Sequence, residues 1–267
     1  MGWYVRSKFK NNCSPLITHY PLPITRMRFD VITLFPDMFT GYFGSSMLKR
    51  AQKNKHVQIF VHNLREYTKD KHAITDDIAY GGISGMVMKV DPIYRAVEKV
   101  KKMSRPIRAH GRLGRPASNG INKKKIRVIL LSAKGKVLTQ AKVRALAKYD
   151  QLIFITGHYK GVDERVAEHI ADEELSVGEY VITGGEVPAM LVVDAVSRMI
   201  PGVIGDPRSK EGESFSKGVQ YEHGVYTRPE VFIPKKGAKW VVPKVLVSGD
   251  HKKIEEWRKK NRVNKEE

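Results

Sequence analysis

Cysteine is almost absent from this sequence, because Cys13 is the single one among 267 residues. One thiol can form neither an intrachain disulfide nor a thiolate metal site, which excludes disulfide-stapled scaffolds and zinc-finger folds. No apolar run reaches the roughly 18–20 residues that would span a bilayer. The sequence therefore predicts a protein of a reducing compartment with no membrane span, and we expect a cytoplasmic location.

Acidic residues are missing from two long stretches of the chain. The first 26 residues contain none, and none lies between Glu98 and Asp150, where 16 lysines and arginines occur. The whole chain has 48 Lys+Arg against 28 Asp+Glu, a formal net charge of +20. A field of this sign attracts polyanions, and nucleic acid is the usual one. A generally lysine-rich composition is the alternative explanation, but the clustering favours a nucleic-acid partner.

Residues 1–26 lack a periodic apolar pattern and include Pro15, Pro21 and Pro23. They also lack the continuous apolar stretch of a secretory signal. A strand-like run, "MRFDVITLF", then begins at Met27 as a chain start often does. We expect residues 1–26 to be a disordered basic extension. It is either a targeting arm or the product of a start codon assigned too early, and the second is favoured.

From Met27 onward, short apolar runs alternate with helix-like segments. The alternation predicts an α/β domain with a mostly parallel sheet. Pro36 is expected at the first position of a helix. We expect strands at Phe29–Leu34, Val57–Val61, Ile126–Leu131, Gln151–Thr156 and Tyr180–Thr183, and helices at Gln140–Lys148, Asp163–Ile170 and Glu186–Ile200.

The pattern changes after residue 204, which predicts a domain of residues 27–204 followed by a flexible linker at 205–220. A small C-terminal unit, 221–267, ends in an amphipathic helix from about His251. Asp250 is placed to cap that helix, with Ile254 and Trp257 on one face. A second polar and basic insertion, Arg105–Lys125, is expected to be disordered when free and to make salt-sensitive phosphate contacts.

Glycine-bearing loops follow three of the predicted strands: "SAKGK" after Leu131, "TGHYKG" after Ile155 and "TGGEVP" after Ile182. Ligands of open α/β sheets bind beyond the carboxyl ends of strands, so the loops predict one compact site. The dinucleotide fingerprint and the P-loop are both absent, which suits an adenosine without a pyrophosphate. Spacing alone favours ordinary turn glycines. No His, Asp or Glu cluster has convincing metal spacing.

Seven motifs, in order along the chain, resemble the TrmD family of bacterial tRNA (guanine-N1)-methyltransferases. The resemblance runs from Met27 to about Arg262. It implies a SPOUT-class α/β domain with a deep C-terminal trefoil knot, a small mainly helical C-terminal domain that binds tRNA, and a homodimer with the active site at the subunit interface. The motifs are "ITLFPDMF", "YGGISGMVM", "GHYKGVDERV", "SVGEYVITGGEVPAM", "VSRMIPGV", "YTRPEVF" and "VLVSGDHKKIEEWR".

The resemblance also implies a bound S-adenosylmethionine, and magnesium during transfer. Backbone groups would bind the adenine edge, while Ile182 and Pro188 supply apolar contact. Lys160 departs from the glutamate usual in the family, and His158, where the family commonly has arginine, is expected to line the pocket. Carried over by motif, the cofactor-binding residues are Leu131, Ser132, Gly157, Tyr159, Ser176, Gly178, Tyr180, Ile182, Gly184, Gly185 and Pro188.

The implied reaction methylates N1 of guanine 37 of tRNA, beside the anticodon. That nitrogen carries a proton, so a general base must take it, and negative charge then builds toward O6. By motif position the base is Glu213, in "GESF", and the cation is Arg198. The family usually has aspartate at the base position, and Asp206 is a possible substitute. Asp163 and Glu164 lie close to the pocket in the motif, although acids are common in any first helical turn.

Two alternatives stay open on the sequence alone. One is a catalytically weak RNA-binding protein on the same fold, which the Glu213 exchange, Lys160 and a C-terminus shorter than usual favour. The other is a knotted methyltransferase with a different RNA target, which Arg198 and the "GESF" and "YTRPEV" motifs disfavour.

Overall fold

The computed structural model describes residues 27–82, 84–103, 125–206, 212–216, 219–235 and 237–262. The expectations for residues 1–26 and for most of the insertion Arg105–Lys125 lie outside these ranges.

A five-stranded sheet in the order β2-β1-β6-β5-β7 forms the centre of the domain. All of its strand pairs are parallel, as the alternating pattern predicts. Every residue of the central strand β6 is buried, because parallel sheets are covered on both faces. The strands are β1 (Met27–Thr33), β2 (Val57–Asn63), β5 (Ile126–Val137), β6 (Gln151–Thr156) and β7 (Glu173–Ser176).

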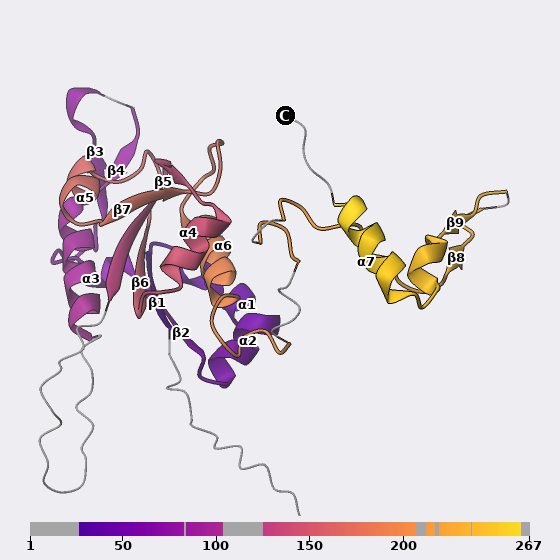
Figure 1. The fold of residues 1–267 in the computed structure, drawn as a ribbon. Helices are drawn as coiled ribbons and strands as arrows, with labels where there is room; N and C mark the ends of the chain where they lie inside the picture. The colour runs from indigo at the N-terminus through magenta and orange to yellow at the C-terminus, as the bar shows by residue number, and fades with distance from the viewer. Residues whose placement is uncertain are drawn as a thin grey trace, which may run out of the picture.

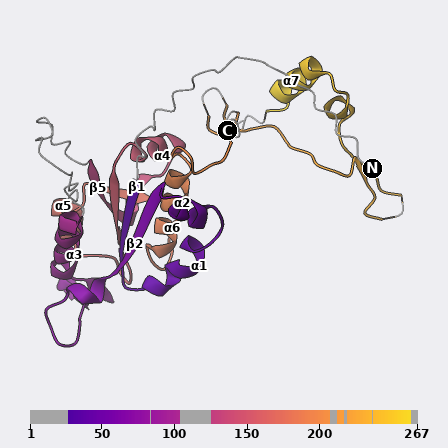
Figure 2. The same cartoon turned by 90° about the horizontal axis from the view of Figure 1, so that it is seen from below.

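Helices cover both faces of this sheet (Figures 1 and 2). Alternate residues of β1 divide between two cores, since successive strand side chains point to opposite faces: Phe29 packs with α6 and Ile32 packs with α3. One face carries η2 (Leu64–Tyr67), α3 (Val90–Met103) and α5 (Glu164–His169), and the other carries η1 (Pro36–Phe39), α1 (Thr40–Phe43), α2 (Ser46–Lys53), α4 (Gln140–Leu146) and α6 (Glu186–Ser197). Pro36 begins η1, as predicted.

The predicted fifth strand at Tyr180–Thr183 is wrong. These residues form part of the loop from β7 to α6, and Val181 is 89% exposed. The β-branched composition of "YVIT" favours a strand, but the run pairs with no strand in the described part of the chain. The fifth strand is instead β7, whose sequence "EELS" has little apolar character.

Strand β5 is longer than predicted and bends at a bulge between Leu131 and Lys136, where its pairing with β7 shifts register. Gly135 makes this close approach possible, because a Cβ there would lie 2.4 Å from the Leu175 nitrogen. Helix α6 ends at Ser197 rather than at Ile200.

A small antiparallel ribbon, β3 (Asp76–Ile78) with β4 (Met86–Met88), projects from the sheet domain (Figure 1). The backbone of Met88 is bonded to the neighbouring loop, since its N–H donates to Gly161 and its carbonyl accepts from Asp163. The ribbon is thereby attached to the loop that follows β6.

The C-terminal segment lies apart from the sheet in both views (Figures 1 and 2). It contains the hairpin β8 (Val231–Phe232) and β9 (Trp240–Val241), the short helix η5 (Lys244–Val247) and helix α7 (His251–Lys260). Asp250 caps α7 as predicted, accepting a hydrogen bond from the Lys253 N–H at 3.1 Å. Within the described ranges, no helix combines the length and the apolar composition needed to cross a membrane.

Candidate active site

A cavity of about 340 Å³ lies at the carboxyl ends of the neighbouring strands β5, β6 and β7. Four segments line it: residues 130–134 within β5, 157–162 after β6, Glu164 and Ala167 of α5, and the stretch from the end of β7 through the long loop into α6. The last of these follows β7 rather than the strand expected at Tyr180–Thr183. All the residues that motif position assigns to the cofactor, from Leu131 to Pro188, are among those that line the cavity, and His158 lines it too.

Glycines allow two of these loops to touch backbone to backbone. The Gly185 N–H donates to the Gly157 carbonyl at 2.8 Å, and His158 forms an isolated bridge with Gly184. A Cβ on Gly185 would lie 2.8 Å from the Thr156 Cα, closer than real Cβ contacts. The glycines in "TGGEVP" are therefore required by a close crossing of the chain beside the cavity, not by a turn alone.

A buried acid that the sequence interpretation missed supports this crossing. Glu186, the first residue of α6, is 2% exposed. Its Oε1 accepts hydrogen bonds from the Thr33 hydroxyl at 2.9 Å and the Thr156 hydroxyl at 3.1 Å. The carboxylate thus joins β1, β6 and the start of α6. Its position at the start of a largely apolar helix is the sequence signal that identifies it.

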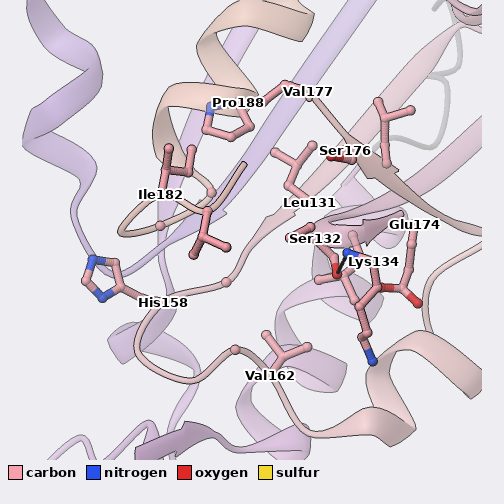
Figure 3. A pocket seen from close by; sticks show the side chains of 18 of the residues that line it. Leu131, Ser132, Lys134, His158, Val162, Glu174, Ser176, Val177, Ile182 and Pro188 are labelled. Atoms are coloured by element: carbon pink, nitrogen blue, oxygen red, sulfur yellow. Dashed lines mark hydrogen bonds between the residues drawn. The ribbon is translucent and has the colours of Figure 1, made fainter. Parts of the chain in front are cut away.

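Opposite ends of the cavity differ in chemical character (Figure 3). His158, Ile182 and Pro188 lie at one end. There the His158 ring packs against the Phe35 ring, with the two ring centroids 4.8 Å apart. Ser132, Lys134 and Glu174 lie toward the other end. The cavity therefore has one end of rings and apolar side chains and another that carries charge.

The predicted base and its cation form a direct ion pair. An Nη of Arg198, the residue that follows α6, donates to Glu213 Oε1 at 2.6 Å, and both side chains are partly exposed. Arg144 of α4 holds the same short segment by donating to the Phe215 carbonyl at 2.6 Å. Asp206, the alternative base, is exposed. Neither Arg198 nor Glu213 lines the cavity, so one chain holds the cofactor pocket and the acid–base pair in separate places.

No group of three or more His, Cys, Asp or Glu side chains arranged to hold a metal ion occurs among the described residues. Lys160 lines the cavity, and its side chain passes Gly85, where a Cβ would lie 2.8 Å from the lysine Cγ.

Known proteins match the chain over almost its whole length. The family model for tRNA (Guanine-1)-methyltransferase TrmD matches residues 27–267. Proteins named tRNA (guanine-N(1)-)-methyltransferase from Bacillus cereus (strain AH820) and Bacillus anthracis (strain A0248) are each 45% identical over 239 residues, covering 90% of this chain and 88% of the relative. The crystal structure of tRNA (m1G37) methyltransferase from Aquifex aeolicus is similar at a TM-score of 0.67 and 34% identity, covering 89% of this chain and 90% of that one.

Proposed function

The chain belongs to the TrmD family of tRNA (guanine-1)-methyltransferases, and we propose that it transfers a methyl group from S-adenosylmethionine to N1 of guanine 37 in tRNA. The observation that carries this proposal is the glycine-lined cavity at the ends of β5, β6 and β7, where the segments that resemble the family's cofactor site meet. Digestion of methylated tRNA to nucleosides tests the chemistry. We expect 1-methylguanosine, and methylation at N7 or N2 would contradict the proposed reaction.

The residues of the cavity suit an adenosine-bearing cofactor. Its volume of about 340 Å³ lies within the usual range of small-molecule sites. His158 Nδ1 and Glu174 Oε2 are buried polar atoms with no hydrogen-bond partner, as expected of groups that meet a ligand. Gly157 and Gly178 contribute main chain without a side chain to the lining. The cofactor, when bound, supplies an electrophilic methyl group on a sulfonium.

The ion pair supplies the acid–base chemistry of the proposed reaction. Guanine N1 must lose its proton as the new bond forms, and the Glu213 carboxylate is assigned as the group that takes it. Arg198, at 2.6 Å from that carboxylate, holds it in place. Its remaining guanidinium donors are available to the negative charge that builds on O6.

A second copy of the chain is proposed to complete the site. The ion pair and the cavity do not meet within one chain, so a partner must bring the base to the cofactor. Helix α6 presents exposed Val187 and Leu191, and Met38 and Tyr42 on the adjoining η1 and α1 are exposed as well. The Tyr42 hydroxyl, which donates to Asp194, ties these elements together. An apolar patch of this kind suits an isologous dimer interface.

The SPOUT-class trefoil knot is part of the same proposal. Support comes from the chain between β7 and α6, whose Gly184 and Gly185 pass directly against the end of β6. Family membership supports a cytoplasmic enzyme. The described residues bring no three candidate ligands together for the magnesium that the resemblance implies.

We propose that the C-terminal hairpin contacts tRNA. Phe232 and Trp240 are directly paired across β8 and β9, with ring centroids 5.6 Å apart, and are 49% and 65% exposed. No acidic residue occurs between Glu230 and Asp250, a stretch that contains four lysines. Exposed aromatic rings amid positive charge are typical of surfaces on which unpaired bases stack.

The Trp240→Ala variant is expected to bind tRNA about tenfold more weakly, because stacking on an aromatic ring contributes roughly 1–3 kcal/mol per base. Val241→Ala is the matched control, since Val241 is the next strand residue, is similarly exposed and points to the other face of the hairpin. Filter binding at fixed salt measures both. Equal affinities of the two variants would remove the hairpin from the interface.

A further inference from the structure

Opposite charges meet at one end of the cavity. The Lys134 ammonium donates to both carboxylate oxygens of Glu164, at 2.8 and 2.6 Å. Glu174 lines the same cavity from β7 and lies beside Lys134 in Figure 3. Lys134 comes from β5, Glu164 from α5 and Glu174 from β7. The fold brings these three side chains together, and we call them the charged end of the cavity.

Glu174 is only partly satisfied by the protein. Its Oε2 is buried and has no hydrogen-bond partner. A buried carboxylate oxygen without a donor costs free energy, and such groups commonly mark a place where a ligand supplies the donor. An ammonium group offers three N–H donors and a positive charge, which makes it the best match to this oxygen.

Lys134 offers the complementary charge. The hydrogen bond that Lys134 donates to Glu164 raises the pKa of Lys134, and the negative charges of Glu164 and Glu174 add to the effect. Lys134 therefore stays protonated at neutral pH. The side chains of Lys134 and Glu164 are 64% and 61% exposed, so Lys134 can turn toward a ligand carboxylate at little cost in stability.

The balance of charge selects the class of ligand. Lys134 and Lys160 on the cavity wall offset Glu164 and Glu174, so the lining has no surplus positive charge of the kind a phosphate requires. A zwitterion, with one carboxylate and one ammonium on the same carbon, matches adjacent opposite charges. The distant end, with Ile182, Pro188 and the glycine backbone, is left for an apolar ring.

We propose that Lys134 and Glu174, with Glu164 as their neighbour, form the subsite for the α-amino-acid end of the cofactor, Lys134 binding its carboxylate and Glu174 its ammonium. The inference rests on the proposed use of S-adenosylmethionine, and it assigns a role to side chains that lie outside the motif-derived set. It predicts that these side chains distinguish a nucleoside carrying an amino-acid tail from the same nucleoside without one.

Calorimetric titration of two thioethers tests this inference. S-adenosylhomocysteine has the amino-acid tail, whereas 5′-methylthioadenosine lacks it, and neither carries the sulfonium charge. Lys134→Met and Glu174→Gln are each expected to weaken S-adenosylhomocysteine about tenfold, the usual effect of losing a charge-assisted hydrogen bond. Binding of 5′-methylthioadenosine should stay within about twofold of wild type, which is less than 0.5 kcal/mol. Lys136→Met and Glu179→Gln, exposed neighbours outside the cavity lining, are the matched controls.

The outcomes separate the amino-acid subsite from the proposed use of S-adenosylmethionine. Equal weakening of both ligands would mean that the substitutions disturb the cavity as a whole, and no weakening of either would mean that the tail binds elsewhere. Both results overturn the amino-acid subsite while leaving the methyltransferase intact. If wild type binds neither thioether, the proposed cofactor and the subsite fail together.

Discussion

The Glu213→Gln enzyme is expected to transfer methyl groups about 100- to 10,000-fold more slowly than wild type, the usual contribution of a general base. Glutamine has the same length and its carbonyl can still accept the hydrogen bond that Arg198 donates at 2.6 Å. It cannot take the proton of guanine N1. Single-turnover transfer from labelled S-adenosylmethionine, with cofactor and tRNA both saturating, measures the chemical step.

The matched control for this prediction is Glu213→Asp, which keeps the carboxylate but withdraws it by one methylene. We expect Glu213→Asp to keep most of the wild-type activity that Glu213→Gln loses. Aspartate is the residue usual at this position in the family the chain resembles. If Glu213→Gln transfers methyl groups at the wild-type rate, the base is another group, and the exposed Asp206 would be tested next.

The Gly185→Ala variant is expected to lose measurable binding of S-adenosylhomocysteine. The added methyl group would lie 2.8 Å from the Thr156 Cα and 3.1 Å from the Gly157 nitrogen, both main-chain atoms that cannot turn away. The loops must separate, which breaks the Gly185–Gly157 hydrogen bond and costs roughly 1–3 kcal/mol of stability as overpacking. Calorimetry measures binding, and thermal unfolding shows whether the variant remains folded.

Gly205→Ala is the control for the effect of adding a methyl group to any glycine. A Cβ at Gly205 would meet nothing within 4 Å, so this variant should bind and unfold as wild type does. Cofactor binding by a folded Gly185→Ala protein with unchanged affinity would contradict the role given to the backbone crossing.

The Glu213→Gln and Gly185→Ala variants together distinguish an active site shared between two subunits from one within a single chain. If each site combines the cavity of one subunit with Glu213 of the other, a mixed dimer of Glu213→Gln and Gly185→Ala subunits has one intact site. Random exchange of equal amounts would then restore about a quarter of wild-type activity, since half of the dimers are mixed. A mixture as inactive as its components would place both parts of the site in one chain.

How much of this molecule is predictable from its sequence depends on whether a local signal exists. Strand β6 has the bounds that "QLIFIT" predicts, because a short apolar run is the direct sign of a strand buried on both faces. Strand β7 has no such sign, since its first residue, Glu173, is held by ion pairs with Arg127 and Lys142 rather than by apolar packing. "YVIT" has the composition of a strand but lies in a loop beside the cavity.

The candidate site divides in the same way. Motif position identified residues that line the cavity, because glycine spacing and the surrounding motifs are preserved locally in the sequence. It did not identify Glu186, Lys134 or Glu174. These matter through contacts between segments far apart in the chain, such as Glu186 with Thr33, and no local pattern encodes such a contact.

Methyl transfer to two tRNA transcripts that differ only at position 37 tests directly whether the enzyme methylates guanine 37. With labelled S-adenosylmethionine, the account predicts label on the transcript with guanine at this position and none on the transcript with adenine. Label on both transcripts would contradict the assignment of the target base. Tight binding of both with label on neither would contradict the enzyme itself and leave a tRNA-binding protein on a methyltransferase fold.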